Sequence, residues 1–317
     1  MLVTGGAGFI GSHIVDALLA QGDEVLAIDN LSTGSRSNLS GAIGAGAELV
    51  EGDIRDAAFV REQHESFRPD AVIHLAAQVD VRKAVLDPAL DAEINVVGTV
   101  SVLEAARRAG GAPVVFASTG GVIYGEGSSR TLPFPETAEL RPETAYGTSK
   151  LSGEAYLELY RRLHDQQSVV LRLGNVYGPR QDPHGEAGVV AIFCGRLLAG
   201  EAPRIFGDGE QTRDYVYVAD VVAATLAATA KLAAGTPLTG PYNIGTGVET
   251  SVLDLAGHLG RISGTTISPE HAAPRMGEIS RVSIDPAAAG QDLGWRPRFE
   301  LAEGLAETYR SIAAGDG

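Results

Sequence analysis

The sequence has little of several residue types, and each scarcity excludes a class of protein. Its 317 residues include one cysteine, Cys194, so no intrachain disulfide can form. Lysine and arginine together number 25 against 40 aspartates and glutamates, which gives a net charge of -15 at pH 7. A chain this acidic does not present the broad basic surface that nucleic acid or an anionic membrane attracts. The expected partner is therefore a small molecule.

Long apolar runs are also missing. The most apolar helix-like stretch, 221–234, is short and contains Lys231, which is too little to cross a bilayer core of about 30 Å. The N-terminus has neither the basic segment nor the long apolar segment of a secretion signal. We therefore expect a cytoplasmic protein that does not associate with membranes.

What the chain does have is an alternation of short apolar runs with amphipathic stretches of helical length. The strand-like runs are 2–4, 25–28, 71–75, 114–118 and 169–173, and the helix-like stretches include 10–21 and 89–109. This alternation predicts an α/β fold with a doubly wound parallel sheet of the Rossmann type. Glycine- and proline-rich segments follow, so we expect a first domain over residues 1–174 and a smaller C-terminal α/β domain over 175–317. A strand near 242–244 is expected to return to the first sheet.

A glycine-rich turn, "VTGGAGFIGSH", joins the first strand to the first helix. Glycines there allow backbone N–H groups to approach a pyrophosphate at the helix N-terminus. The spacing is GxxGxxG rather than GxGxxG. For the glycines taken alone, an ordinary tight turn is the alternative interpretation. The cofactor-binding residues expected in this turn are Gly5, Gly8, Phe9, Ile10 and Gly11.

An acidic residue, Asp29, follows the second strand and precedes Asn30. A carboxylate at this place can accept hydrogen bonds from the adenosine ribose and would repel a 2′-phosphate. The alternative interpretation is a solvated turn at the strand end. Together with the glycine turn, Asp29 favours NAD over NADP as the cofactor.

Tyr146 and Lys150 lie four residues apart in "AYGTSK" and therefore share one face of the predicted helix. An ordinary phenol has a pKa of about 10, and a nearby ammonium group favours its ionised form. Such pairs are common on exposed helices without any function. This one follows a strand that ends in Ser118 and Thr119, where ligands sit in open parallel sheets, which indicates a catalytic group.

These motifs, in this order, resemble the extended short-chain dehydrogenase/reductase family over nearly the whole chain. They are GGAGFIGSH, the Asp29–Asn30 strand end, GDIRD, HLAAQ, Ser118 with Thr119, YxxxK, LRLGNVYGP and TRDYVYVAD. Within the family the chain is similar to the nucleotide-sugar 4-epimerases, typified by UDP-galactose 4-epimerase.

The resemblance implies a reaction and a role for each matching residue. Tyr146 would take the proton from the sugar O4, and C4 would give hydride to tightly held NAD and regain it on the opposite face, which interconverts UDP-glucose and UDP-galactose. Lys150 would lower the pKa of Tyr146 and bind the nicotinamide ribose, and Thr119 or Ser118 would hydrogen-bond O4. The residues implied along the cofactor are Asp53, Ile54, Leu75, Ala76 and Ala77.

The same resemblance implies a substrate side that holds a UDP-sugar. The residues that match are Asn175, Arg213 and Arg275, together with Tyr177 and Phe206, for which core packing is the alternative. Arginine suits a diphosphate because its planar fork makes two parallel hydrogen bonds to phosphate oxygens. Val282 falls near a family position that limits the size of the sugar, and a small side chain there would admit an N-acetyl group.

Several alternatives stay open. Gly120 and Gly121 stand where related 4,6-dehydratases carry an acidic residue, which disfavours elimination. The rivals are a UDP-glucuronate or UDP-N-acetylhexosamine 4-epimerase, a nucleotide-sugar dehydratase or reductase, and a non-enzymatic NAD sensor. Helices near 89–109 and 146–162 resemble those that pair in relatives, so we expect a homodimer.

The histidines do not suggest a metal site. His74 and His13 are expected to be packed side chains rather than bases. His184 has no second histidine or cysteine at the spacing of metal ligands, so no metal is predicted.

Overall fold

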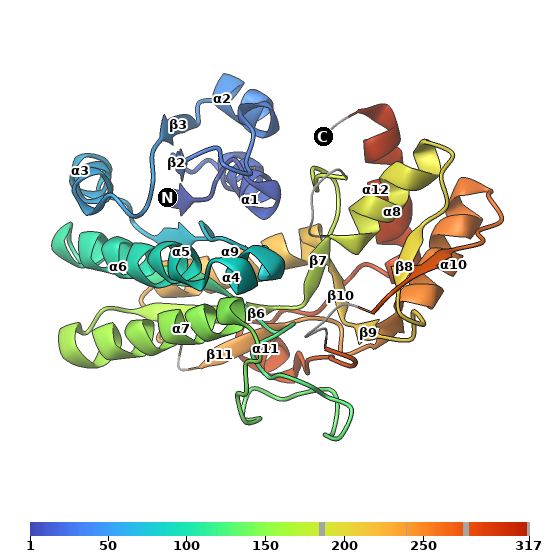
Figure 1. Ribbon diagram of the computed structural model, residues 1–317. Helices are drawn as coiled ribbons and strands as arrows, with labels where there is room; N and C mark the ends of the chain where they lie inside the picture. Colours follow the sequence, from blue (N-terminus) through green and yellow to red (C-terminus); the bar gives the residue numbers. More distant parts are fainter. Residues whose placement is uncertain (184–187, 239, 275–278, 316–317) are drawn as a thin grey trace.

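A seven-stranded parallel sheet forms the centre of the protein in the computed structural model, which describes residues 1–183, 188–238, 240–274 and 279–315 (Figure 1). The strand order is β11-β6-β5-β4-β1-β2-β3, so the order reverses between β1 and β4. This arrangement confirms the predicted Rossmann-type fold. The strands are β1 (Leu2–Thr4), β2 (Leu26–Asp29), β3 (Glu48–Glu51), β4 (Val72–His74), β5 (Val114–Thr119), β6 (Ser168–Leu173) and β11 (Pro241–Ile244).

The strands bury apolar side chains on both faces of the sheet. Along β5, Val115 points into one core cluster, whereas Val114 and Phe116 point into the other. Such alternation follows from the two-residue period of a strand. One cluster is covered by α1 (Phe9–Ala20) and α9 (Val218–Ala233), and the other by α3 (Ala57–Phe67), α6 (Gly98–Arg108) and α7 (Ala145–His164).

The stretch 89–109, predicted as one helix, is divided in the structure. It comprises α5 (Pro88–Ala92), a π-helical turn η2 (Glu93–Val97) and α6, and α4 (Val81–Leu86) precedes it. Single π-helical turns of this kind are frequent at functional sites. The turn carries Asn95, whose buried side-chain amide is hydrogen-bonded to the backbone of Gln78.

The edge strand β3 lies at a segment for which no strand is predicted. Its four residues, Glu48–Glu51, have a polar residue at each end and are only partly buried. An apolar run so short and so exposed gives little signal in the sequence.

Shorter elements form the second part of the protein, gathered on the right of Figure 1. Three two-stranded sheets pair β7 with β10, β8 with β13 and β9 with β12. Beside them the chain returns to the large sheet through α9 and β11, which pairs with β6 at the segment where a returning strand is expected.

The bounds of these elements are β7 (Asn175–Tyr177), α8 (Val189–Leu198), β8 (Arg204–Phe206), β9 (Thr212–Arg213), β10 (Tyr215–Tyr217), β12 (Thr250–Ser251), α10 (Val252–Ser263), β13 (Glu270–Ala272), α11 (Ala287–Asp292) and α12 (Leu301–Ala314). Two short helical turns, η1 (Arg36–Leu39) and α2 (Ser40–Gly44), connect β2 to β3. Within the described ranges, no helix is long and apolar enough to span a membrane.

Candidate active site

The glycine-rich turn fits tightly between β1 and α1. Gly5 has φ +70°, and a Cβ atom built there would lie 2.7 Å from the backbone nitrogen of Ala76. A Cβ on Gly11 would lie 2.1 Å from the carbonyl oxygen of Gly5, and Gly8 is the N-cap of α1. Side chains at these positions would therefore displace the turn from the helix.

This turn has the properties of an anion-binding site. The amides of Phe9, Ile10 and Gly11 belong to the first turn of α1, where N–H groups have no acceptor within the helix. The turn lies at the carboxyl end of β1, next to the point where the strand order reverses, which is where dinucleotides bind in such sheets. The residues present therefore fit the pyrophosphate of NAD.

Asp29 lies directly beside this turn. Its Oδ2 accepts a hydrogen bond from the Ala7 amide at 3.0 Å, and its Oδ1 accepts one from the Leu31 amide at 2.8 Å. Burial raises the pKa of Asp29, and these hydrogen bonds oppose the rise. The structure thus brings together the glycine turn and the acidic residue that the sequence analysis connects.

Asn30 and Asp53 are linked to each other near the same strand ends. The Asn30 side-chain amide donates to Asp53 Oδ2 at 3.1 Å, and the Arg55 guanidinium pairs with the same carboxylate at 2.8 Å. Hydrogen bonds from Arg55 lower the pKa of Asp53 to about 2. The carboxylate therefore already has partners within the chain, although it is partly exposed.

The neighbouring residue Ile54, also expected along the cofactor, has an apolar side chain. That side chain is buried in the core, and a Cβ on Gly98 would lie 2.6 Å from its Cδ1. Leu75 and Ala76 follow β4, and both amides donate to the Thr4 carbonyl at 3.1 Å, so this segment, with Ala77, adjoins the glycine turn.

Tyr146 and Lys150 meet near the carboxyl ends of β5 and β6. Thr144 caps α7 by accepting a hydrogen bond from the Gly147 amide at 3.0 Å, so Tyr146 lies in the first turn of the helix. Lys150 Nζ lies 5.9 Å from the centroid of the Tyr146 ring and donates to the Ala117 carbonyl at 2.9 Å. The two side chains share a face of α7, as their spacing predicts.

Burial changes the ionisation of both groups. It lowers the pKa of Lys150 to about 8, so the ammonium group is still mostly charged at pH 7. It also raises the pKa of Tyr146, and the negative charge of Asp91 adds to that rise. In the protein alone, the pKa of Tyr146 is thus raised, whereas Lys150 is expected to lower it. The free energy lost on desolvating a phenolate exceeds the stabilisation that one ammonium group supplies.

The hydroxyls of Ser118 and Thr119 have different surroundings. Ser118 Oγ donates to Glu154 Oε1 at 2.5 Å, within a buried network that includes Arg172. Thr119, the last residue of β5, lines the same cavity as Tyr146. Neighbouring residues of a strand point to opposite sides, so only one hydroxyl can face a ligand in this cavity.

A cavity of about 480 Å³ opens at this place, within the size range of small-molecule sites. Among the residues singled out in the sequence, those that line it are Thr119, Gly121, Tyr146, Asn175, Tyr177, Phe206 and Arg213. A Cβ on Gly121 would lie 3.2 Å from Asn175 Oδ1 and 3.8 Å from Thr119 Oγ1. A side chain at 121 would therefore project into the polar part of the cavity.

Two residues implied on the substrate side lie largely in the core. Tyr177 contributes to the cavity, but it is buried, and its hydroxyl donates to the Leu301 carbonyl at 3.3 Å. Val282 belongs to a buried cluster with Phe134 and Ile284, and its expected role in limiting sugar size stays a prediction. Arg275 lies outside the described residues.

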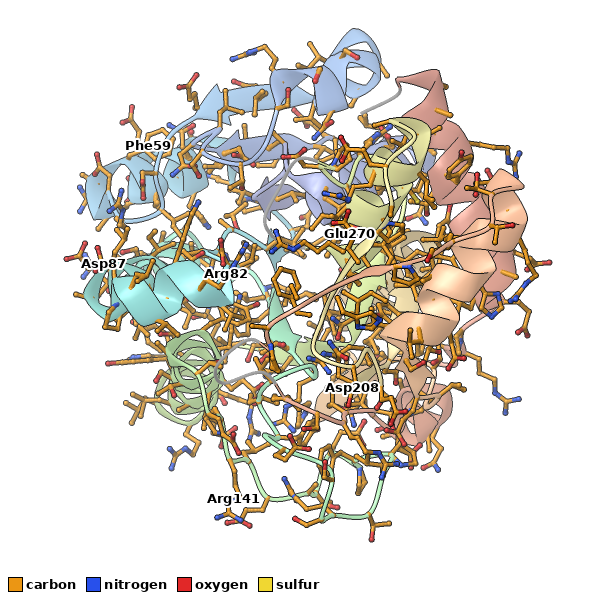
Figure 2. The ribbon with its side chains drawn as sticks, turned by 45° about the vertical axis from the view of Figure 1, so that its right-hand side comes forward. Phe59, Arg82, Asp87, Arg141, Asp208 and Glu270 are labelled. Carbon is orange, nitrogen blue, oxygen red and sulfur yellow. The ribbon has the colours of Figure 1, made fainter. Side chains whose placement is uncertain are left out.

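Several polar lining residues were not anticipated. They are Asp80, Arg82, Thr144, Gln181, Arg204, Gln211 and Tyr215. Arg204 stands two residues before Phe206 on β8, so the strand period carries a signal for it. Arg82 is the second residue of α4, and Figure 2 shows it toward the middle of the molecule, with Asp87 at the outer edge.

His74 and His13 both have hydrogen-bond partners within the chain, as expected of packed side chains. His74 is buried between the hydroxyls of Thr4 and Thr99, at 2.7 and 3.0 Å, and burial lowers its pKa to about 3. His13 contacts the Pro179 carbonyl at 2.9 Å. In the described part of the chain, no group of three His, Cys, Asp or Glu side chains is arranged to hold a metal ion, and His184 lies outside that part.

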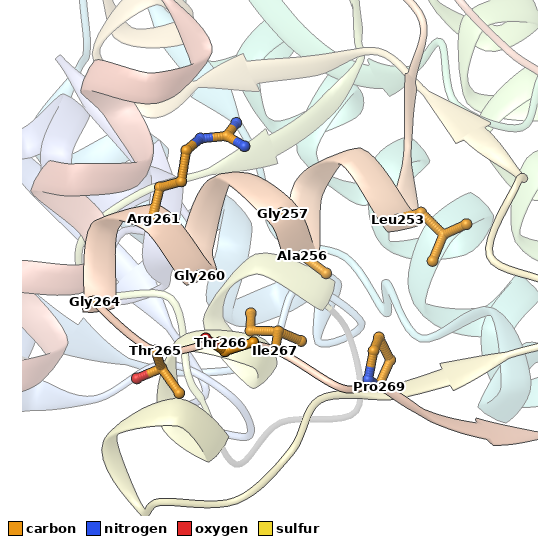
Figure 3. Close-up of a pocket in the computed structure, with 10 residues that line it drawn as sticks. All are labelled: Leu253, Ala256, Gly257, Gly260, Arg261, Gly264, Thr265, Thr266, Ile267 and Pro269. Carbon is orange, nitrogen blue, oxygen red and sulfur yellow. The ribbon is translucent and has the colours of Figure 1, made fainter.

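A second cavity, of about 510 Å³, lies between α10 and residues 265–269 (Figure 3). Its lining consists of glycine, threonine and apolar residues together with Arg261. It offers no acid–base pair among the described residues. The chemistry therefore belongs to the cavity that contains Tyr146.

The fold and this site define a class of protein. A dinucleotide-binding turn at the switch point of a parallel sheet lies beside a tyrosine–lysine pair and a cavity with arginines. This is the arrangement of a Rossmann-fold enzyme that takes a nicotinamide cofactor and an anionic substrate.

Comparisons with known proteins agree with this class and narrow it. The NAD dependent epimerase/dehydratase family matches residues 1–245. UDP-glucose 4-epimerase of Mycolicibacterium smegmatis is 47% identical over 308 residues, which cover 97% of this chain and 96% of that protein. The chain therefore belongs to the NAD dependent epimerase/dehydratase family.

Two solved structures are similar throughout. UDP-glucose 4-epimerase of Thermotoga maritima, solved with UDP-glucose, superposes with a TM-score of 0.93 at 44% identity, covering 99% of this chain and 98% of that one. UDP-glucose 4-epimerase of Thermus thermophilus, solved with NAD, has a TM-score of 0.89 at 43% identity, covering 98% of each chain.

Proposed function

We propose that this protein is an NAD-dependent nucleotide-sugar 4-epimerase that interconverts UDP-glucose and UDP-galactose. The observation that carries the proposal is that Thr119 and Tyr146 line one cavity with Asn175 and Arg213, while Lys150 lies beside the Tyr146 ring at the end of β5. The family and the relatives named above support the same activity.

The residues assigned to NAD are the glycine turn with the first turn of α1, Asp29 with Asn30, and the segments at Asp53–Ile54 and Leu75–Ala77. Bound there, NAD would supply the hydride acceptor and donor for the sugar C4, and its oxidised ring would add a positive charge beside Tyr146. We assign residues 1–174, with the returning β11, mainly to this cofactor and residues 175–317 mainly to the nucleotide sugar. A cytoplasmic location belongs to the same proposal.

The proton at the sugar O4 is handled by three side chains. Tyr146 Oη takes this proton and returns it after the sugar has turned, and Thr119 Oγ1 hydrogen-bonds O4. The Lys150 ammonium, about 6 Å from the phenol ring, stabilises the phenolate by about 3 kcal/mol at an effective dielectric constant of about 20. The N-terminus of α7 stabilises a negative charge on Tyr146 by a further amount of about 0.3–1 kcal/mol.

The cavity favours epimerisation over elimination. Elimination of water across C5 and C6 needs a further acid–base group, beside the residues that bind the hydroxyl at C4. Gly121 offers none, although it lies next to Thr119 and Asn175. Asp80, the carboxylate among the described lining residues, caps α4 and pairs with Arg82. We therefore place the 4-epimerase ahead of a dehydratase.

Proton NMR of the purified protein tests the function directly. UDP-glucose, UDP-galactose, their N-acetyl counterparts and UDP-glucuronate are each incubated without added cofactor, and inversion at C4 is followed. We expect the protein to invert UDP-glucose and UDP-galactose without added cofactor, because NAD should stay bound through purification. Faster turnover of an N-acetyl sugar or the glucuronate would change the named substrate, whereas no inversion even with added NAD would reject the 4-epimerase.

Replacing Thr119 with alanine should lower kcat for C4 inversion by about 10²-fold, because the sugar O4 would lose the hydroxyl group that hydrogen-bonds it during proton transfer. The matched change Ser118→Ala should mainly lower stability, by about 1–3 kcal/mol, because Glu154 loses a buried hydrogen bond. Steady-state kinetics and urea unfolding of both variants separate these effects. The reverse pattern would assign the catalytic hydroxyl to Ser118.

We also propose a homodimer formed through α4, α5, η2 and α7. These neighbouring elements expose large apolar side chains, of which Leu86 is 85% exposed; the others are Val85, Leu90, Val97 and Tyr156. Solvent-exposed apolar side chains gathered on one face are typical of a protein interface. The same helices lie together on one side of the molecule in Figure 1.

Leu86→Glu should convert the dimer to a monomer at micromolar concentration, because the charge would be buried between two copies. Val248, 59% exposed on a loop elsewhere, provides the matched control Val248→Glu, which should leave the dimer intact. Sedimentation velocity of the three proteins gives the answer. A wild-type protein that sediments as a monomer would rule out the dimer.

A further inference from the structure

A buried carboxylate that the mechanism above does not use, Asp91, lies behind the tyrosine–lysine pair. It belongs to α5, which packs against α7, and it is 1% exposed. Its Oδ1 accepts hydrogen bonds from the side-chain amides of Gln78 and Asn95, both at 3.0 Å. Its Oδ2 is buried and has no hydrogen-bond partner among the described residues.

A buried carboxylate of this kind lowers the stability of the folded protein, because it loses its hydration and two neutral amides replace the lost water only in part. Isolated buried polar atoms of this kind are rare and call for an explanation. Two amide donors on Oδ1 fit the ionised form, which only accepts hydrogen bonds. The uncompensated negative charge therefore acts on whatever lies nearby.

What lies nearby is Lys150 and Tyr146. The charge of Asp91 raises the pKa of each of them, and for Lys150 it opposes the fall that burial causes. Glu154 also raises the pKa of Lys150, but the Arg172 guanidinium, at 2.6 Å, compensates the charge of Glu154. Asp91 has no such cationic partner among the described residues.

The other charged groups around α5 are more exposed or neutral. On β4, His74 is neutral because burial keeps its pKa at about 3. On α4 and its N-cap, Asp80 pairs with Arg82, and Lys83 is exposed. Glu93 of η2 and Asp87 at the start of α5 are exposed to solvent, which screens them.

We propose that Asp91 is a positioning residue of the active site, whose uncompensated negative charge keeps the buried Lys150 ammonium group protonated over the pH range in which the enzyme works. Through Oδ1 it also holds Gln78 against Asn95, at the end of the segment assigned to the cofactor. This role rests on the function proposed above, since it matters only where Lys150 serves Tyr146.

The chain suits a direct test, because it contains only three lysines, Lys83, Lys150 and Lys231. With ¹³C-labelled lysine, the Lys150 signal is identified by its loss in Lys150→Met, and its titration is followed by NMR. In the wild type we expect a midpoint near pH 8. In Asp91→Asn, which keeps the shape and removes the charge, the midpoint should fall by about one pH unit.

The matched control is Asp87→Asn, the same change at an exposed N-cap of the same helix, where asparagine caps equally well. Its Lys150 titration should superpose on that of the wild type. Asp91→Ser removes the same charge with a smaller side chain, and it should lower the Lys150 titration midpoint by a similar amount. It therefore replaces Asp91→Asn as the test variant if Asp91→Asn does not fold. An unchanged Lys150 midpoint in a folded Asp91 variant would overturn the proposal.

The pH dependence of C4 inversion adds a second readout. Loss of the Asp91 charge should move both limbs of the kcat/KM profile to lower pH, because it acts on Tyr146 and Lys150 in the same direction. A purely structural role would lower kcat/KM at every pH without displacing the profile, which also contradicts the proposal. If the wild type inverts no sugar, the proposed function fails, while the lysine titration still reports on Asp91.

Discussion

Tyr146→Phe should reduce kcat for C4 inversion by about 10³-fold or more, because it removes the group that takes and returns the O4 proton. The ring, its packing and the glycine turn stay in place, so the purified variant should still contain NAD. Single-substrate kinetics by NMR and the content of NAD released on denaturation measure the two effects.

The control for this substitution lies on the same helix. Tyr160 is partly buried on α7 and donates to Glu104 at 3.3 Å, away from the cavity, so Tyr160→Phe should retain nearly full activity. Turnover by Tyr146→Phe within tenfold of the wild type would reject the proposed mechanism. Loss of bound NAD together with activity would instead assign Tyr146 to cofactor retention.

Arg172→Met should lower the free energy of unfolding by about 3–5 kcal/mol, because Glu154 would remain charged and buried without its partner. The Arg172 and Glu154 side chains are only 4% and 9% exposed and form two hydrogen bonds with each other, at 2.6 and 3.0 Å. Arg172 also donates to the Tyr124 hydroxyl at 2.9 Å. Urea unfolding of both proteins gives the difference.

Two further variants make this result interpretable. The double variant Glu154→Leu with Arg172→Met should recover much of the loss, because replacing both charges with apolar groups of similar volume is often neutral or stabilising. Arg310→Met breaks an exposed pair with Glu307 and should change stability by less than about 1 kcal/mol. A small effect of Arg172→Met alone would mean that water reaches this network.

The general fold could be predicted from the sequence because each signal is local. Alternating apolar runs and amphipathic helices follow from the periods of strand and helix, and they predict the parallel sheet. The exceptions are also local in origin. The exposed edge strand β3 has too few apolar residues to be detected, and the π-helical turn at Glu93–Val97 has no pattern that distinguishes it from a regular helix.

The site divides in the same way. The proximity of Tyr146 and Lys150 could be predicted because it depends only on four residues of one helix. By contrast, Ser118 and Thr119 are adjacent in sequence, and the sequence does not show that Glu154, 36 residues beyond Ser118, binds the Ser118 hydroxyl while Thr119 lines the cavity. Ile54 and Val282 illustrate the same limit, because their partners in the core come from other elements.

The sequence by itself determined the class of fold, the glycine turn with Asp29, and the tyrosine–lysine pair, because regular periods and short spacings place these residues. Only the tertiary structure decided the surroundings of Ser118, the cavity positions of Arg82 and Arg204, and the place of Asp91 behind Lys150. The physical reason is that burial and charge act through space. The elements that surround these groups come from distant parts of the chain and meet only when it has folded.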